Sequence, residues 1–311
     1  MEVQSSSPAR LLTFDVTPTL LRRAALAAVA ALYVIVATGG LVRLTASGLG
    51  CSGWPGCEAG AFFPEKDAHA FVEFGNRVFG VLPITLTFLT WLVARRLPVL
   101  PLWARWVALC TFLGTLAQAP LGRITITFDL HPLLVMSHFL LALVVLAGAV
   151  VVALEARGLE RGHAEPLVPG ELRRAGLVLV AAGLALVVSG TFVTAAGPHS
   201  GGADIQRFGA LSDALYVHVR VTALFGCTFL FLLGYLAARR QRSPRLFRLA
   251  VVLLLMVLAQ MAVGELQWRL ELPWQIVLVH LALAAAVWGL TVALAALLFR
   301  PLRSFAAPDA A

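Results

Sequence analysis

The sequence predicts an all-α protein that crosses a membrane eight times, and three observations support this fold class. The 311 residues are 60% hydrophobic and only 13% charged, with a mean hydropathy of +0.89, which is too apolar for a soluble domain. Eight apolar runs reach the roughly 20 helical residues that a membrane core requires. Polar residues recur inside these runs at one fixed offset, which predicts two copies of a four-helix bundle.

The eight expected spans are long continuous runs, so helix is the expected spanning form. They are 24–44, 74–95, 104–122, 132–154, 175–196, 214–237, 246–265 and 274–299. The expected division of the chain is an N-terminal segment (1–23), a first bundle (24–154), a linker (155–174), a second bundle (175–299) and a tail (300–311). No small-residue cleavage site follows the first run. We therefore expect an uncleaved span rather than a signal peptide, and no soluble domain before or after the helices.

The placement of basic residues predicts the orientation. All but seven of the 24 basic residues fall in the N-terminal segment, the links 95–105, 155–174 and 238–248, or the tail. By the positive-inside rule, both termini lie in the cytoplasm and the protein is in the cell membrane. Topology thus explains the net charge of +8, and no nucleic-acid partner is expected. The seven on the other side are Arg43, Lys66, Arg77, Arg123, Arg207, Arg220 and Arg269.

The stretch from Gln118 to His138 returns 142 residues later as Gln260 to His280. In both copies a glycine follows the glutamine by four residues, and the histidine follows it by 20. Polar residues inside membrane helices are functional candidates by default. The matched pairs are Gln118 and Gln260, Gly122 and Gly264, His138 and His280, and Asn76 and His218.

The last two of these pairs lie near the outer starts of the second, fourth, sixth and eighth spans, roughly 10 Å into the membrane. Two facing imidazoles can supply both axial ligands of a heme iron, so His218 and His280 predict a heme site. Hydrogen-bonded contacts between helices are the alternative. Zinc is disfavoured because no third or fourth ligand converges at that depth in the second half.

Four outer-side arginines are candidates for binding the two heme propionates, which need cationic partners. Snorkelling of these side chains toward lipid headgroups is the alternative. The candidates are Arg77, Arg220, Arg43 and Arg123, and Arg207 lies close to the same surface.

Three segments and the three histidines together resemble the heme A synthase family, membrane enzymes that convert heme O to heme A for terminal oxidases. The segments are GGLVRLTASGLGCSGWPGC (39–57), EFGNR (73–77) and GTFVTAAGPHSGG (190–202). The resemblance covers about residues 20–300. It implies oxidation of a methyl group of heme O to a formyl group, a b-type heme in the C-terminal half, and the substrate heme in the N-terminal half. It also implies a heme O synthase as supplier and an electron donor or acceptor, and leaves a homo-oligomer open.

The family usually has histidine where this chain has Asn76. Asparagine is a poor iron ligand, so the first half has one good ligand, His138, for the substrate heme. An open iron position suits oxygen chemistry, whereas a bis-histidine heme suits electron transfer or a structural role. Glu73 shares a helix face with Asn76, and its counterpart is Leu215. The resemblance favours a catalytic, proton-transferring Glu73; a first-turn acid stabilised by the helix dipole is the alternative.

The four cysteines divide into two classes. Cys51 and Cys57 lie in the first outer loop, where an oxidising compartment allows a disulfide, and the resemblance implies a redox-active or structural pair. Cys110 and Cys227 lie within expected helices and are expected to be small core residues. His199 is the one further histidine that we would test near a heme edge.

Two other function classes stay open. A di-heme electron carrier, similar to a cytochrome b, would need two closed histidine pairs, and Asn76 counts against it. A repeat-built transporter would have polar residues at the midplane and broken helices, whereas the polar residues here lie near one face and no glycine or proline is expected to interrupt a helix at mid-depth.

Overall fold

The computed structural model describes residues 16–58, 60–65, 67–199 and 207–305. Its eight long helices are each apolar enough to cross a membrane, and no β-strand forms in these residues, so the all-α class and the eight spans are confirmed. The helices are α1 (Pro18–Leu44), α2 (Ala68–Arg96), α3 (Leu102–Thr127), α4 (Pro132–Arg161), α5 (Gly170–Ala196), α6 (Leu211–Ala238), α7 (Pro244–Arg269) and α8 (Trp274–Phe299), followed by the short helix η1 (Arg303–Phe305).

Most helices extend beyond the apolar runs that predicted them. One of these extensions is at the start of α2, which begins at Ala68 rather than at 74. The side chain of Asp67 caps this start by accepting a hydrogen bond from the backbone N–H of His69 at 3.1 Å. The next turns bury Glu73 and Phe74. Hydropathy does not detect these turns because they are polar and pack against a loop rather than against lipid.

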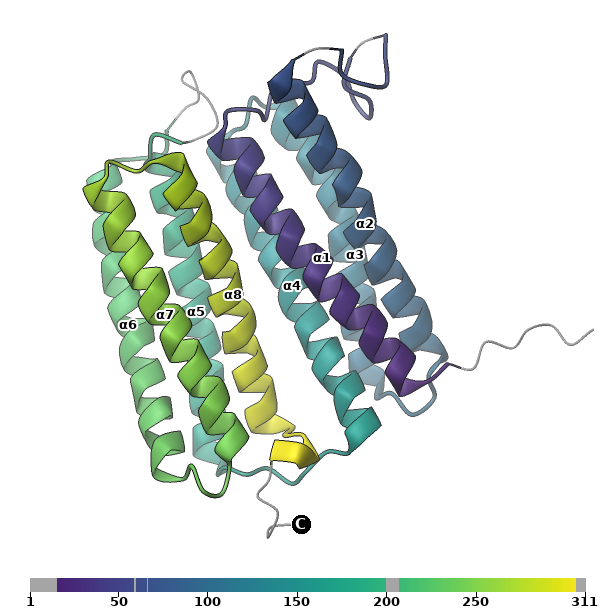
Figure 1. The fold of residues 1–311 in the computed structure, drawn as a ribbon, viewed down its shortest axis with the longest axis vertical. Helices are drawn as coiled ribbons and strands as arrows, with labels where there is room; N and C mark the ends of the chain where they lie inside the picture. Colours follow the sequence, from purple (N-terminus) through teal and green to yellow (C-terminus); the bar gives the residue numbers. More distant parts are fainter. Residues whose placement is uncertain (1–15, 59, 66, 200–206, 306–311) are drawn as a thin grey trace, which may run out of the picture.

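Figure 1 shows the helices in two groups that lie side by side, α1–α4 and α5–α8. Within each group, sequential helices pack against one another and the first packs against the last. The start of α1 and the end of α8 lie at the same end of the molecule, here called the terminal end. The loops after α1, α3, α5 and α7 lie at the opposite end, here called the loop end.

The two groups meet through α1 and α4 on one side and α5 and α8 on the other. Apolar side chains from both groups form one buried cluster there, which includes Leu32, Leu146 and Trp288. The indole N–H of Trp288 donates to the carbonyl of Leu143 at 2.8 Å. The phenol of Tyr33 donates to the carbonyl of Ala282 at 3.2 Å. The groups therefore share a continuous packed interface.

Ion pairs hold the terminal end together. Arg300, just after α8, makes two hydrogen bonds of 2.8 Å to the buried carboxylate of Glu155 on α4. Glu160, one turn further along α4, pairs with Arg22 of α1 at 2.6 Å. Both acidic residues at this end of α4 are thus bound to arginines outside it.

Pro83 lies near the middle of α2, at a depth where we expected no proline to interrupt a helix. Proline removes one backbone hydrogen bond, yet α2 remains a single helix through this position. The broken helices of repeat-built transporters do not occur in the described residues.

Candidate functional site

His218 lies two turns into α6 and faces α5. Its Nδ1 atom lies 2.9 Å from the hydroxyl of Ser189. A Cβ atom added at Gly190 would approach the imidazole Cε1 to 3.2 Å, so only glycine leaves the ring its present room. A histidine whose Nδ1 is held by a neighbour presents Nε2 in a fixed direction, as in many metal-binding histidines.

His280 lies in the second turn of α8 and faces α7. A Cβ atom at Gly264 would approach its Cε1 to 3.1 Å. Its Nε2 lies 3.0 Å from the amide nitrogen of Gln260, while its Nδ1 is buried without a partner.

His138 on α4 has nearly the same surroundings on α3. A Cβ atom at Gly122 would approach its Cε1 to 3.4 Å, and its Nδ1 is buried without a partner. The amide of Gln118 donates to its backbone carbonyl at 3.1 Å. The glutamine, glycine and histidine that recur in the sequence therefore meet in space in both groups of helices.

Asn76 occupies the place on α2 that His218 occupies on α6, and a hydroxyl binds it too. Thr38 on α1 donates to the Asn76 side-chain oxygen at 2.8 Å. Thr38 and Ser189 are 151 residues apart, nine more than the 142 residues that separate the other pairs. The difference comes from the loops, because 23 residues separate α1 from α2 whereas 14 separate α5 from α6. This pair does not follow the 142-residue offset, so the repeat in the sequence does not reveal it.

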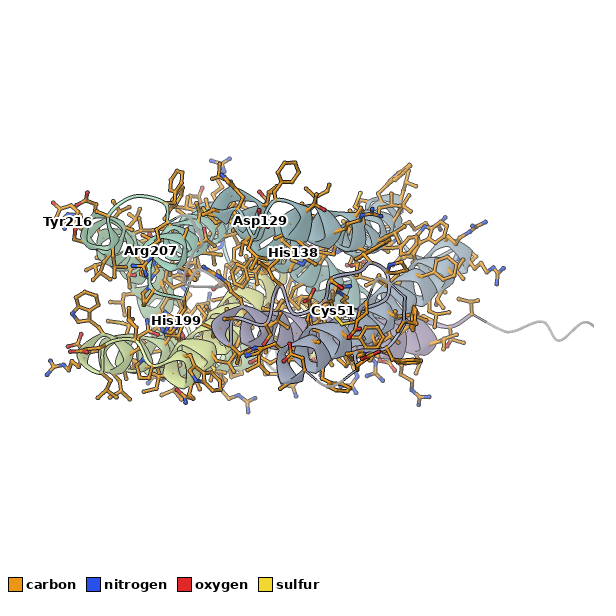
Figure 2. All side chains as sticks on the ribbon, turned by 90° about the horizontal axis from the view of Figure 1, so that it is seen from above. Cys51, Asp129, His138, His199, Arg207 and Tyr216 are labelled. Atoms are coloured by element: carbon orange, nitrogen blue, oxygen red, sulfur yellow. A yellow bond between two sulfur atoms is a disulfide. The ribbon has the colours of Figure 1, made fainter. Side chains whose placement is uncertain are left out.

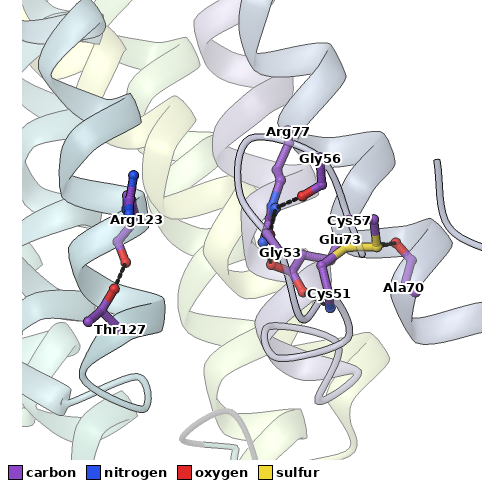
Figure 3. Close-up of polar contacts among 9 residues, drawn as sticks. All are labelled: Cys51, Gly53, Gly56, Cys57, Ala70, Glu73, Arg77, Arg123 and Thr127. Atoms are coloured by element: carbon purple, nitrogen blue, oxygen red, sulfur yellow. Dashed lines mark hydrogen bonds and ion pairs between the residues drawn. A yellow bond between two sulfur atoms is a disulfide. The ribbon is translucent and has the colours of Figure 1, made fainter. Parts of the chain in front are cut away.

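Glu73 is turned toward the loop between α1 and α2 and is only 3% exposed. One carboxylate oxygen accepts a hydrogen bond from the backbone N–H of Cys51 at 2.8 Å, and the other pairs with Arg77. Arg77 also donates to the carbonyls of Gly53 and Gly56, at 2.8 and 2.9 Å (Figure 3). Both side chains therefore bind the loop, and no hydrogen bond joins Glu73 to Asn76.

Cys51 and Cys57 form the predicted disulfide. Both residues are buried against α2, where they form a cluster with Ala70 and Phe74. Together with Arg77 and Glu73, the disulfide fixes the loop over the start of α2.

The other three propionate candidates differ in their surroundings. Arg43 is half-buried and donates to the carbonyl of Thr194 at 2.9 Å, which joins α1 to α5. Arg123 is exposed and lies 5.0 Å from the Trp54 ring, apart from the Glu73 cluster (Figure 3). Arg220 is exposed and lies 3.4 Å from the Tyr216 ring.

Figure 2, a view onto the loop end, places Cys51 and His138 over the first group and His199, Arg207 and Tyr216 over the second. The Nε2 atom of His199 lies 2.6 Å from the carbonyl oxygen of Leu272. No hydrogen bond joins His199 to a candidate heme ligand within the described residues. Cys110 and Cys227 are exposed on the helix surfaces, so the expectation that they are core residues is wrong. A small apolar side chain is equally compatible with a lipid-facing position.

The loop-end halves of α6, α7 and α8 contribute little to the packed interior. Among the described residues, buried side chains begin at Phe225 on α6, end at Leu253 on α7 and begin at Ala285 on α8. His218 and His280 lie in this sparsely packed part. Two imidazoles beside glycines, of which His280 has a buried nitrogen without a partner, fit a flat ring with axial ligands.

The sequence profile of the COX15-CtaA family, described as cytochrome oxidase assembly protein, matches residues 22–292. The chain belongs to this family. A heme A synthase of Symbiobacterium thermophilum is 29% identical over 287 residues, which cover 86% of this chain and 92% of that protein. A heme A synthase of Bacillus pumilus is 29% identical over 128 residues, 40% of each protein. One of Shewanella oneidensis is 31% identical over 125 residues, 34% of this chain and 37% of that protein.

Membership has two consequences. Eight apolar helices in a member of this family make the chain a multi-pass membrane protein. Its heme A synthase relatives make it an oxidoreductase whose chemistry involves heme. The family match spans all the candidate ligands in both groups of helices.

Proposed function

We propose that this protein is a heme A synthase that oxidises a methyl group of heme O to a formyl group for the assembly of terminal oxidases. The observation that best supports this is the family match over residues 22–292, within which each group of helices holds a histidine against a glycine near the loop end. The arrangement is that of two repeated four-helix bundles in the cell membrane, with both termini in the cytoplasm.

The second bundle would hold a resident heme b through His218 and His280. A heme with two imidazole ligands supplies one-electron transfer when bound. Ser189 binds Nδ1 of His218, which leaves Nε2 for the iron. His280 offers its unpartnered Nδ1, or Nε2 after rotation of the Gln260 amide. The exposed Arg220 lies two residues after His218 and would pair with a propionate.

The first bundle would bind the substrate, heme O, through His138. Nδ1 of His138 is buried without a partner. Asn76 is held by Thr38 and is a weak ligand, so it would leave one face of the substrate open to an oxidant. Arg43, Arg77 and Arg123 are the propionate candidates here; Arg123 is the freest of them, since Arg77 and Arg43 already bind protein oxygens.

Glu73 is the proposed proton-transferring group. It lies one turn from Asn76 on α2, and two donors hold its carboxylate, the Cys51 N–H and Arg77. A positioned carboxylate at the edge of the site can accept or donate a proton during methyl oxidation. The same contacts give it a second role, because they couple the disulfide loop to the helix that carries Asn76.

An electron carrier with two hemes and no substrate conversion is the second candidate. The recurrence of glutamine, glycine and histidine around His138 and His280 favours it. It would leave heme O unchanged in the first bundle, whereas a heme A synthase converts it. As partners we propose a heme O synthase that supplies the substrate and an electron donor or acceptor; a homo-oligomer is compatible with the exposed apolar helix surfaces.

Ligand variants test the proposal and its division between the bundles. We expect His218→Ala and His280→Ala each to remove the low-spin absorption of heme b. His138→Ala should keep that absorption and abolish heme A in the extracted pigment. Unaltered spectra in both second-bundle variants would refute the ligand assignment. Normal heme A formation by His138→Ala would refute the substrate site.

A further inference from the structure

A strongly basic pocket lies at the terminal end, away from the histidines. It has a volume of about 450 Å³ and opens between the end of α4 and the start of α7, beside η1. Four arginines line it, with an apolar wall beneath them. The arginines are Arg157, Arg161, Arg245 and Arg248, and the wall includes Leu249 and Val252.

The arginines of the pocket have no acidic partners among the residues that the structure describes. Glu155 and Glu160, the two acids at this end of α4, bind Arg300 and Arg22 instead. Within the described residues, no ion pair includes any arginine of the pocket, and no acidic residue lines it. Arg245 donates to the carbonyl of Ser304, and the other three make no side-chain hydrogen bond within the described part.

The chain places these charges together by helical spacing. Arg157 and Arg161 are four residues apart and share a face of α4. Arg245 and Arg248 are three residues apart and share a face of α7. Like charges this close repel one another. The two on α7 also lie in its first turns, where the helix dipole disfavours cations. An anion in the pocket would relieve both effects.

We propose that this pocket binds the phosphate group of an anionic phospholipid. Guanidinium groups bind phosphate oxygens in bidentate geometry. The pocket lies at the helix ends, the depth of lipid headgroups, and basic pockets between membrane helices commonly take such lipids. Val252, one turn deeper than Arg248, is 47% exposed and offers an apolar surface for an acyl chain. A free phosphate ion would make no use of that wall.

The test compares two variants with the same change of charge. The pocket variant is Arg157→Gln, Arg161→Gln, Arg248→Gln; it leaves Arg245, which also binds the backbone. The control is Arg96→Gln, Arg240→Gln, Arg242→Gln, three exposed arginines at the same end that do not line the pocket. Native mass spectrometry of the full-length protein would count retained phosphatidylglycerol and phosphatidylcholine from mixed micelles of equal content.

We expect the wild-type protein and the control to retain phosphatidylglycerol preferentially, and the pocket variant to bind it about tenfold more weakly or worse. Equal retention of the two lipids by the wild type would overturn the proposal. Equal loss in both variants would overturn it too, since the attraction would then come from diffuse surface charge. If inorganic phosphate binds the wild type and no phosphatidylglycerol is retained, the ligand is a free anion and the lipid assignment is wrong. Unchanged heme absorption in the pocket variant would verify that it is folded.

Discussion

Gly264 controls the position of the candidate ligand His280, because the imidazole ring packs directly against it. Because a Cβ atom at Gly264 would lie 3.1 Å from the imidazole Cε1, the larger Gly264→Val should displace the ring. We expect most of the low-spin heme absorption to be lost. Gly226→Val on α6 is the control, since nothing lies within 4 Å of a Cβ there. Equal absorption in the two purified variants would contradict the role of Gly264.

Glu73 differs from its counterpart Leu215 in carrying a titratable group. Glu73→Gln can still accept the Cys51 N–H bond but loses the charge that pairs with Arg77. Heme O or a partly oxidised intermediate should accumulate, while the heme b of the second bundle stays bound. Glu265→Gln is the control, because it removes an exposed Glu–Arg pair at the loop end of α7.

Normal heme A formation by Glu73→Gln, measured in extracted pigment, would show that Glu73 only anchors the loop. Loss of heme b would show that the division between the bundles is wrong.

The sequence predicted which polar residues recur but not all that they contact. Offset alone paired His138 with His280, and the structure adds that each lies against a glycine on the preceding helix. The sequence did not predict that Glu73 turns toward the loop. Residues three apart share a helix face, yet a side chain at the first turns can also bend toward backbone N–H groups of a loop that hydropathy does not place.

The loop between α1 and α2 and the start of α2 form one structural element. Cys51 and Cys57 close a small ring, the Cys51 N–H binds Glu73, and Arg77 binds two loop carbonyls. Helix boundaries inside this element were predicted poorly, since α2 begins six residues before its apolar run. Apolar runs report contact with lipid, whereas this turn is stabilised by its Asp67 cap and by the loop.

Removal of the disulfide tests this element. A ring of this size contributes about 2 kcal/mol in the chain-entropy account, so Cys51→Ser with Cys57→Ser should make the segment 52–65 more susceptible to limited proteolysis. The variant Cys110→Ser with Cys227→Ser, which alters two exposed cysteines, should cleave at the wild-type rate. Peptide mapping of non-reduced wild-type protein that found two free thiols at Cys51 and Cys57 would contradict the bond itself.

The whole molecule depends on the interface between the two groups of helices. Trp288 is buried there and donates to Leu143 across it. Trp288→Phe leaves that carbonyl without its donor and should lower the free energy of unfolding by about 1–2 kcal/mol. Thermal unfolding in detergent would measure this, with the exposed Trp268→Phe as the control. An unchanged midpoint would mean that the bond does not stabilise the interface.

At this scale the sequence predicted the class and the number of helices, because apolar runs of membrane length have one stable form. It did not predict how α1 and α4 meet α5 and α8. Contacts such as Gly40 with Leu281 join positions 241 residues apart in a uniformly apolar sequence, where no periodicity distinguishes a helix-facing side from a lipid-facing one.

Heme extracted from the purified wild-type protein shows whether the first bundle converts heme O to heme A. The protein would be produced in cells with and without a co-expressed heme O synthase, and the pigments separated chromatographically. We expect heme B in both preparations, and heme A or a partly oxidised form of heme O only when heme O is supplied. Unaltered heme O beside heme B would contradict it and favour a two-heme electron carrier.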